Sequence, residues 1–234
     1  GSIGKVDKEE KDLADYMERT GKPLVLNIDD ERLYGIKENY NENSELITFG
    51  KKEEADYQIA DVKVGQNGTH FVFKYYDNSM EVELNAYGEG YVYDAMAAII
   101  VANKLSVPIG DCIENVKDFR SNSGRFEKLE YGDNLVIVND AYNANPDSMK
   151  MSLDTFSEIY PSEEYFRVVI LGDMRELGDV QEQKHRELGE YVLGKDFDKV
   201  YYVGDLYDSF GQGENISSAD EVAAMLNEKL DTWK

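Results

Sequence analysis

Residues 136–149 read Val-Ile-Val-Asn-Asp-Ala-Tyr-Asn-Ala-Asn-Pro-Asp-Ser-Met, and this stretch decides the fold class. The three β-branched residues at its start predict a strand that is buried in a sheet. Asn145 before Pro146 predicts the N-cap and first turn of a helix. Ligands bind open α/β sheets outside the carboxyl ends of the strands. We therefore expect a ligand-binding edge here. The alternative is an Asn-rich loop that only satisfies its own backbone.

Further strand and helix patterns lie on both sides of this stretch. Strands are expected at 166–171 and 199–203, each followed by a helix, which predicts a Rossmann-like domain with an open, mostly parallel sheet. The N-terminal half starts with strand–helix units as well. It then turns into an antiparallel meander over residues 57–84, with Gln66-Asn67-Gly68 as a hairpin turn. The fold class is therefore α/β.

The best candidate for a linker is Ser-Asn-Ser-Gly at residues 121–124, because these residues are small or polar. A second hairpin is expected just after it, from strands at 125–131 and 135–138. We therefore expect two domains, at residues 1–122 and 123–234.

Composition excludes several classes of partner. The chain has 48 acidic and 25 basic residues, for a net charge of −23, so repulsion opposes nucleic acid and anionic membranes as main partners. Its one cysteine, Cys112, excludes an internal disulfide and a cysteine-based zinc site. No run approaches the 18 or so apolar residues of a membrane span. We expect a cytoplasmic protein without membrane insertion. The sequence does not indicate an oligomeric state.

Three other stretches carry residues suited to chemistry. Residues 171–178, Leu-Gly-Asp-Met-Arg-Glu-Leu-Gly, follow a predicted strand, and His185 comes in the next helix, where a surface or capping histidine is the alternative. Arg125 is a planar donor suited to phosphate or carboxylate, unless it is only a surface arginine. Asp29 and Asp30 also end a strand and could bind Mg²⁺ or simply cap a helix. No P-loop, Gly-x-Ser-x-Gly elbow or His-Glu-x-x-His motif is present.

Taken in order, these motifs resemble the Mur ligase family. The resemblance rests on Gly124-Arg125, on Asp-Ala-Tyr-Asn-Ala-Asn-Pro-Asp-Ser-Met at residues 140–149, and on residues 171–178 with His185. It is closest to the MurF-type branch, the UDP-N-acetylmuramoyl-tripeptide D-alanyl-D-alanine ligases. Residues 26–30 and 47–50 also resemble parts of the family's central domain.

The resemblance implies a particular place in a longer protein. Residues 1–122 would be the second half of a Mur-type central ATPase domain, and residues 123–234 a Rossmann-like C-terminal domain truncated at its end. A phosphate-binding loop would then lie upstream of residue 1, so we expect the fragment alone to be inactive.

The activity implied by the resemblance is that of an ATP-dependent ligase that forms an amide bond through an acyl-phosphate intermediate in cell-wall peptide synthesis. ATP and Mg²⁺ would be the cofactors. The partners would be small molecules: a nucleotide, a carboxylate and an amine, such as an amino acid or dipeptide.

The resemblance also assigns roles to individual residues. Arg125 would contact the nucleotide phosphates and Asp140 the ribose hydroxyls, which suits a fork-shaped donor and a carboxylate. The residues that would shape the cleft wall are Tyr142, Asn143 and Asn145. The family has a carbamylated lysine that binds Mg²⁺, and Lys11 lies at about the right spacing. Lys8 is close by, and a solvated helix lysine is the alternative.

One stretch departs from the family pattern. The family usually has Gly-x-His-Asn-x-x-Asn-Ala before its Ala-rich helix, where this chain has Gly90, Tyr91 and Asp94 in place of the histidine and the two asparagines. Tyr91 could stack on a base, or the nucleotide preference could differ. The departure favours a divergent homologue, for example an archaeal ligase that acts on pseudomurein peptides or a tetrapyrrole coenzyme. A non-catalytic module that kept the fold is the remaining alternative.

Overall fold

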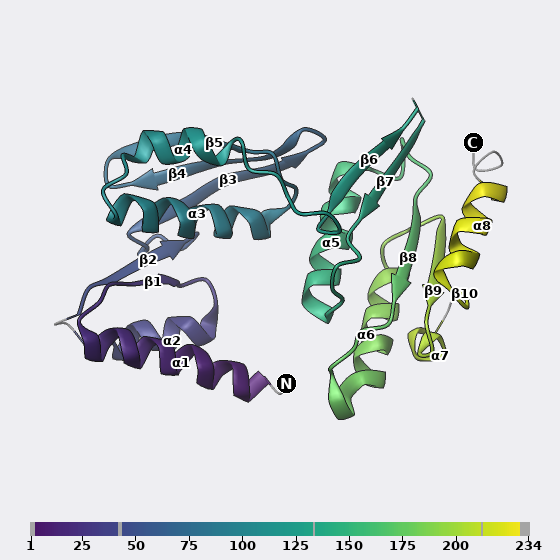
Figure 1. The fold of residues 1–234 in the computed structure, drawn as a ribbon, viewed down its shortest axis with the longest axis horizontal. Coiled ribbons are helices and arrows are strands. Elements are labelled where there is room, and N and C mark those ends of the chain that lie inside the picture. The colour runs from purple at the N-terminus through teal and green to yellow at the C-terminus, as the bar shows by residue number, and fades with distance from the viewer. Residues whose placement is uncertain (1–2, 42–43, 133, 212, 230–234) are drawn as a thin grey trace. The chain divides into compact units, whose positions relative to one another are not determined.

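The computed structural model contains both strands and helices (Figure 1) and describes residues 3–41, 44–132, 134–211 and 213–229. The chain divides into two compact units, Gly1–Ser121 and Asn122–Lys234. Each unit has its own sheet and its own buried core, so each is described by itself.

A five-stranded sheet in the order β1-β2-β3-β4-β5 forms the first unit. Its strands are β1 (Leu24–Asn27), β2 (Leu46–Gly50), β3 (Tyr57–Gly65), β4 (Gly68–Tyr75) and β5 (Asn78–Leu84). β1, β2 and β3 pair in parallel, and β3, β4 and β5 pair antiparallel. The antiparallel part is the meander that the sequence predicts. Tight turns can join only antiparallel neighbours, which is why the sheet changes direction there.

The turn between β3 and β4 shows why a glycine is needed there. Gly68 has φ +124°, a conformation that L-residues avoid, and a Cβ at this position would lie 2.1 Å from the carbonyl oxygen of Leu84. The predicted hairpin turn is therefore confirmed, and it brings β5 close against the start of β4.

The helices that the structure describes in the first unit are α1 (Ile3–Thr20), α2 (Glu31–Asn39), α3 (Glu89–Lys104) and α4 (Ile109–Val116). The core includes one face of α3, with Val92, Met96 and Ile99, packed against sheet residues such as Phe71 and Phe73. Cys112 of α4 joins the same core at 6% exposure, and burial raises the pKa of its thiol. Among the described residues, no helix is both long and apolar enough to cross a membrane.

The second unit has a three-stranded parallel sheet in the order β10-β9-β8 and a separate antiparallel pair, β6 and β7. The strands are β6 (Glu127–Tyr131), β7 (Leu135–Asn139), β8 (Val168–Gly172), β9 (Lys199–Val203) and β10 (Glu214–Ile216). The helices are α5 (Pro146–Ile159), the 3₁₀ turn Gly178–Val180, α6 (Gln181–Leu193), α7 (Tyr207–Phe210) and α8 (Ala219–Lys229). The expected α/β fold with a mostly parallel sheet is confirmed.

The structure corrects the prediction for β7. The expected hairpin is confirmed, because β7 pairs with β6, although Asp133 of its turn lies outside the described residues. The expected burial in the parallel sheet is wrong: all of Leu135–Asn139 is only half-buried, and no described strand other than β6 pairs with β7. Three β-branched residues favour a strand, but they do not determine which sheet it joins.

The core of the second unit lies between α5, α6 and the parallel sheet, with Leu153, Leu188, Leu171 and Tyr202 at its centre. Helix α6 also contacts α7 very closely. A Cβ added at Gly189 would lie 1.9 Å from the carbonyl oxygen of Phe210, so only glycine fits at this crossing.

Candidate functional site

Two segments of the second unit meet at the carboxyl end of β7. We call residues 123–127 the arginine loop and residues 139–145 the polar turn. The backbone N–H of Tyr142 donates to the carbonyl oxygen of Gly124 at 3.0 Å, and the N–H of Phe126 donates to Oδ1 of Asp140 at 2.9 Å. Arg125 lies between these two bonds, so its backbone is held on both sides.

The arginine loop has an unusual backbone conformation. Gly124 has φ +78° and Phe126 has φ +47°. A left-handed conformation at a non-glycine residue costs on the order of 1 kcal/mol, and such residues cluster at functional sites. Phe126 is held there by its bond to Asp140 and by a side chain that is only 5% exposed. Arg125 is thus exposed, while Gly124 and Phe126 on either side of it are buried.

The side chain of Arg125 is exposed and lies over an aromatic ring. Its Cζ atom is 4.2 Å from the ring centroid of Tyr142, which is itself 66% exposed. This distance is well within the range of a cation–π contact. The predicted phosphate donor and a predicted residue of the cleft wall are therefore in direct contact.

Glu127 closes the base of the arginine loop. One of its carboxylate oxygens accepts from the hydroxyl of Ser123 at 2.8 Å, from the N–H of Gly124 at 3.0 Å and from Nδ2 of Asn139 at 3.2 Å. The hydroxyl of Ser123, followed by the other two donors, favours the charged form and lowers the pKa of Glu127. The carboxylate is ionised above that lowered pKa, so these bonds persist at neutral pH and weaken only in acid.

Asp140 links three elements at this point. Its Oδ1 accepts from Phe126, and its Oδ2 accepts from the hydroxyl of Ser152 on α5. The side chain is nevertheless exposed, and a carboxylate has about four acceptor sites. Asp140 can therefore hold the arginine loop and still accept from hydroxyl groups of a ligand.

The asparagines of the polar turn mostly satisfy local backbone groups. Asn145 is the N-cap of α5 and accepts from the N–H of Ser148 at 2.9 Å, which confirms the predicted cap. Asn143 accepts from the N–H of Ala144 at 2.9 Å, and its side chain is exposed. The alternative of a self-satisfying loop therefore holds for these two side chains but not for Asp140 or Tyr142.

The stretch after β8 is structural in this unit. Asp173 accepts from the N–H groups of Asp205 and Leu206, at 2.9 and 3.2 Å, which ties β8 to the end of β9. His185 is fully buried: its Nε2 accepts from the N–H of Met174 at 2.9 Å, and its Nδ1 faces the carbonyl oxygen of Gln181 at 2.8 Å. Both ring nitrogens are used, so neither a surface position nor a free catalytic histidine fits.

We expect His185→Leu to lower the free energy of unfolding of the second unit by about 2–3 kcal/mol, because it leaves the buried N–H of Met174 without an acceptor. Urea unfolding, with exchange of the α6 amides as the local probe, measures the loss. His70 on β4 is exposed, so His70→Leu should stay within about 0.5 kcal/mol. Equal losses for the two variants would contradict the role given to His185.

The acidic pair at the end of β1 also has structural partners. Asp30 is the N-cap of α2, as the cap alternative predicts, and accepts from the N–H groups of Arg32 and Leu33. Asp29 accepts from the N–H of Lys51 at 2.7 Å and from the hydroxyl of Tyr93 at 2.8 Å. Burial, followed by this bond to Asp29, raises the pKa of Tyr93. Asp29 therefore joins the ends of β1 and β2 to α3.

Two other predicted site residues lie on α3. The hydroxyl of Tyr91 is 2.6 Å from Oγ of Ser121, and its ring is 5.9 Å from that of Phe119. Asp94 is exposed on the same helix. Tyr91 thus uses its hydroxyl within the first unit, and a role of either residue toward a base stays a prediction.

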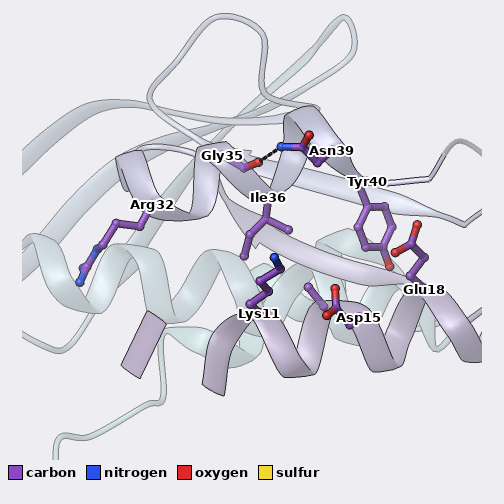
Figure 2. Close-up of a pocket in the computed structure, with 9 residues that line it drawn as sticks. Lys11, Asp15, Glu18, Arg32, Gly35, Ile36, Asn39 and Tyr40 are labelled. Carbon is purple, nitrogen blue, oxygen red and sulfur yellow. Dashed lines mark hydrogen bonds between the residues drawn. The ribbon is translucent and has the colours of Figure 1, made fainter. Parts of the chain in front are cut away.

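Lys11 lines a cavity of about 560 Å³ between α1 and α2 (Figure 2). In Figure 2 its side chain points toward Ile36 of α2, with Asp15 beside it on α1, while Glu18 and Tyr40 lie together at the other end. No group of three or more His, Cys, Asp or Glu side chains placed to bind a metal occurs in the part of the chain that the structure describes. A carbamylated Lys11 therefore stays a prediction.

In a comparison with known protein families, two family models match this chain, each over a different part of it. Residues 1–102 match the Mur ligase middle domain, and residues 124–232 match the Mur ligase glutamate ligase domain. Together these matches include the arginine loop from Gly124 onward, the polar turn and the end of β1.

Among curated relatives, the UDP-N-acetylmuramoyl-tripeptide–D-alanyl-D-alanine ligase of Bacillus subtilis is 33% identical over 160 residues, which covers 68% of this chain and 34% of that protein. Among solved structures, MurF from Acinetobacter baumannii aligns with a TM-score of 0.78 at 22% identity, over 91% of this chain and 46% of that one. MurF ligase from Thermotoga maritima in complex with ADP aligns with a TM-score of 0.74 at 24% identity, over 90% and 47%. The chain spans about a third of the curated relative's length, and the structural likeness shows a shared fold.

Proposed function

Because this chain belongs to the Mur ligase family, we propose that it forms part of an ATP-dependent ligase that joins a carboxylate to an amine. The observation that carries the proposal is the arrangement around β7, where an exposed Arg125 and an exposed Asp140 are held at one strand end. A guanidinium for phosphates beside a carboxylate for hydroxyls is the pairing that a nucleotide needs.

In the proposed reaction, the terminal phosphoryl group of ATP passes to the carboxylate, and ADP leaves. The amine then attacks the acyl phosphate, and inorganic phosphate departs as the amide forms. Phosphoryl transfer depends mainly on positioning and on charge stabilisation, which is the work assigned to Arg125. We assign Asp140 to the ribose hydroxyls and the exposed Asn143 to the wall that faces the incoming amine.

The name of the Bacillus subtilis relative supports a MurF-type ligase that adds D-alanyl-D-alanine in cell-wall peptide synthesis. Mg²⁺ is the expected companion of ATP, and a carbamylated Lys11 would be one ligand. The described residues contain no group of three or more His, Cys, Asp or Glu side chains that could hold a metal, and Asp29 and Asp30 accept from backbone N–H groups. We therefore assign no step to the metal.

One observation favours a divergent substrate as the second candidate. Tyr91 replaces the family's asparagine, and its hydroxyl contacts Ser121 within the first unit. A ligase with this change would recognise the nucleotide base differently, and its carboxylate substrate could lie outside peptidoglycan synthesis.

The test uses the gene product in which this chain occurs. We expect it to bind ATP in a calorimetric titration and to release phosphate only when a carboxylate and an amine are both supplied. D-Alanyl-D-alanine and other amines, each paired with a panel of carboxylates, identify the substrates. The isolated 234 residues should show no turnover. If the gene product binds no nucleoside triphosphate, the chain belongs to a non-catalytic module that kept the fold.

A further inference from the structure

Tyr142 is exposed in the polar turn, yet its ring is in contact with another side chain. A 66% exposed tyrosine contributes little to a core, and its ring lies 4.2 Å from the guanidinium carbon of Arg125. We propose that Tyr142 is a positioning residue, which holds the guanidinium of Arg125 in the orientation that receives the phosphates of a nucleotide. The inference rests on the proposed function, and it adds a residue that sets affinity for the phosphate part of the ligand.

The backbone makes this contact a fixed one. The N–H of Tyr142 donates to the carbonyl oxygen of Gly124, the residue before Arg125. This bond holds the backbone of Tyr142 next to that of Arg125. A Cβ at Gly124 would lie 3.4 Å from both Cβ and N of Tyr142, and φ at Gly124 is +78°. The distances leave room for a Cβ, but residues with a side chain rarely adopt this φ, so a larger residue at position 124 would strain the arginine loop beside Tyr142.

The contact with Tyr142 also reduces the conformational entropy that the side chain of Arg125 loses when a ligand binds. An arginine side chain has many rotamers, and ordering it on binding lowers affinity. A guanidinium that already lies on an aromatic face has lost part of this freedom before the ligand arrives. A guanidinium that contacts a ring through its face keeps its N–H donors at its edge, and a phosphate is bound through that edge.

Another arginine–aromatic pair in the same unit, Arg167 with Phe197, shows what a pair with a purely structural role looks like. Arg167 lies 5.0 Å from the ring centroid of Phe197, but it is only 4% exposed and donates to the carbonyl oxygens of Lys195 and Asp196. The Nη2 group of Arg167 is thus used inside the protein. Arg125 differs because the residue is exposed, and the N–H of the next residue, Phe126, donates to Asp140 at the end of β7.

The test measures nucleotide affinity by calorimetry on the gene product in which the chain occurs. Tyr142→Leu should weaken ATP binding about threefold to tenfold, the size of one cation–π contact, and leave adenosine binding unchanged. Tyr142→Phe keeps the ring and should bind ATP within about twofold of the parent. Tyr131 is also exposed, at 54%, and lies on β6, so Tyr131→Leu is the matched control and should bind like the parent.

A double-mutant cycle with Arg125→Met separates positioning from a general effect on the fold. With Arg125 replaced, Tyr142→Leu should cause no further loss of ATP affinity. Additive losses, an equal loss for adenosine, or a Tyr142→Phe variant as weak as Tyr142→Leu would overturn the inference. If the parent binds ATP and Tyr142→Leu binds it equally well, only this inference fails. If the parent binds no triphosphate, the proposed function fails and the inference with it.

Discussion

Replacing Gly189 with alanine is expected to lower the free energy of unfolding of the second unit by about 2–3 kcal/mol, the cost of forcing an extra carbon into a packed contact. The new Cβ would lie 1.9 Å from the carbonyl oxygen of Phe210 and 2.8 Å from its carbonyl carbon. Both are backbone atoms, so no side-chain rotation relieves the clash. Helix α7 must move away from α6, and with it the ring of Phe210, which is 1% exposed.

Gly35 of α2 is the matched control, because it is also a glycine within a helix. A Cβ there would meet no atom within 4 Å, so Gly35→Ala should stabilise the first unit by about 0.5–1 kcal/mol through helix propensity alone. The same chemical change thus has opposite signs at the two sites. Urea denaturation with amide exchange in each unit measures both. A neutral or stabilising Gly189→Ala would contradict the close approach of α6 and α7.

The second large effect concerns activity. Asp140→Ala should lower kcat/KM of the gene product about 100-fold or more, which corresponds to about 2.7 kcal/mol or more. The change removes the acceptor proposed for the ribose hydroxyls. It also removes the acceptor of the Phe126 N–H. Phe126 has φ +47°, so the arginine loop loses a hydrogen bond that holds it in this conformation. Ligand contact and loop geometry are lost together, which is why the expected effect exceeds that of Tyr142→Leu.

Ser152→Ala is the control for Asp140, because it removes a partner of the same carboxylate without touching the loop or the proposed ligand. It should change kcat/KM less than about threefold, since one exposed hydrogen bond contributes little. Circular dichroism of each variant checks the fold. An Asp140→Ala variant within about fivefold of the parent activity would show that the carboxylate does not contact the nucleotide.

Much of the fold could be predicted because it depends on local signals. The N-cap at Asn145, the proline after it and the turn at Gly68 each fix the backbone within a few residues. Helix α7 and strand β10 were not predicted. They have four and three residues, which is too short to show a period.

The candidate site could be predicted only in part, because several of its contacts join distant residues. The pairing of Asp140 with Ser152 spans 12 positions, and that of Asp29 with Tyr93 spans 64, so no local pattern reveals them. Glu127 lies within the strand that the sequence predicts at 125–131, but its role depends on Asn139 from the next strand. The pairing of β7 with β6 was predicted, but its low burial was missed for the same reason.

The single buried thiol described above has a practical consequence for following the first unit on its own. Cys112 is 6% exposed within the core of that unit, and its raised pKa keeps it in the unreactive thiol form. An alkylating reagent can therefore reach it only when α4 separates from the sheet. Because the chain has one cysteine, the rate of its modification reports how often the first unit opens, with no added label and no signal from the second unit.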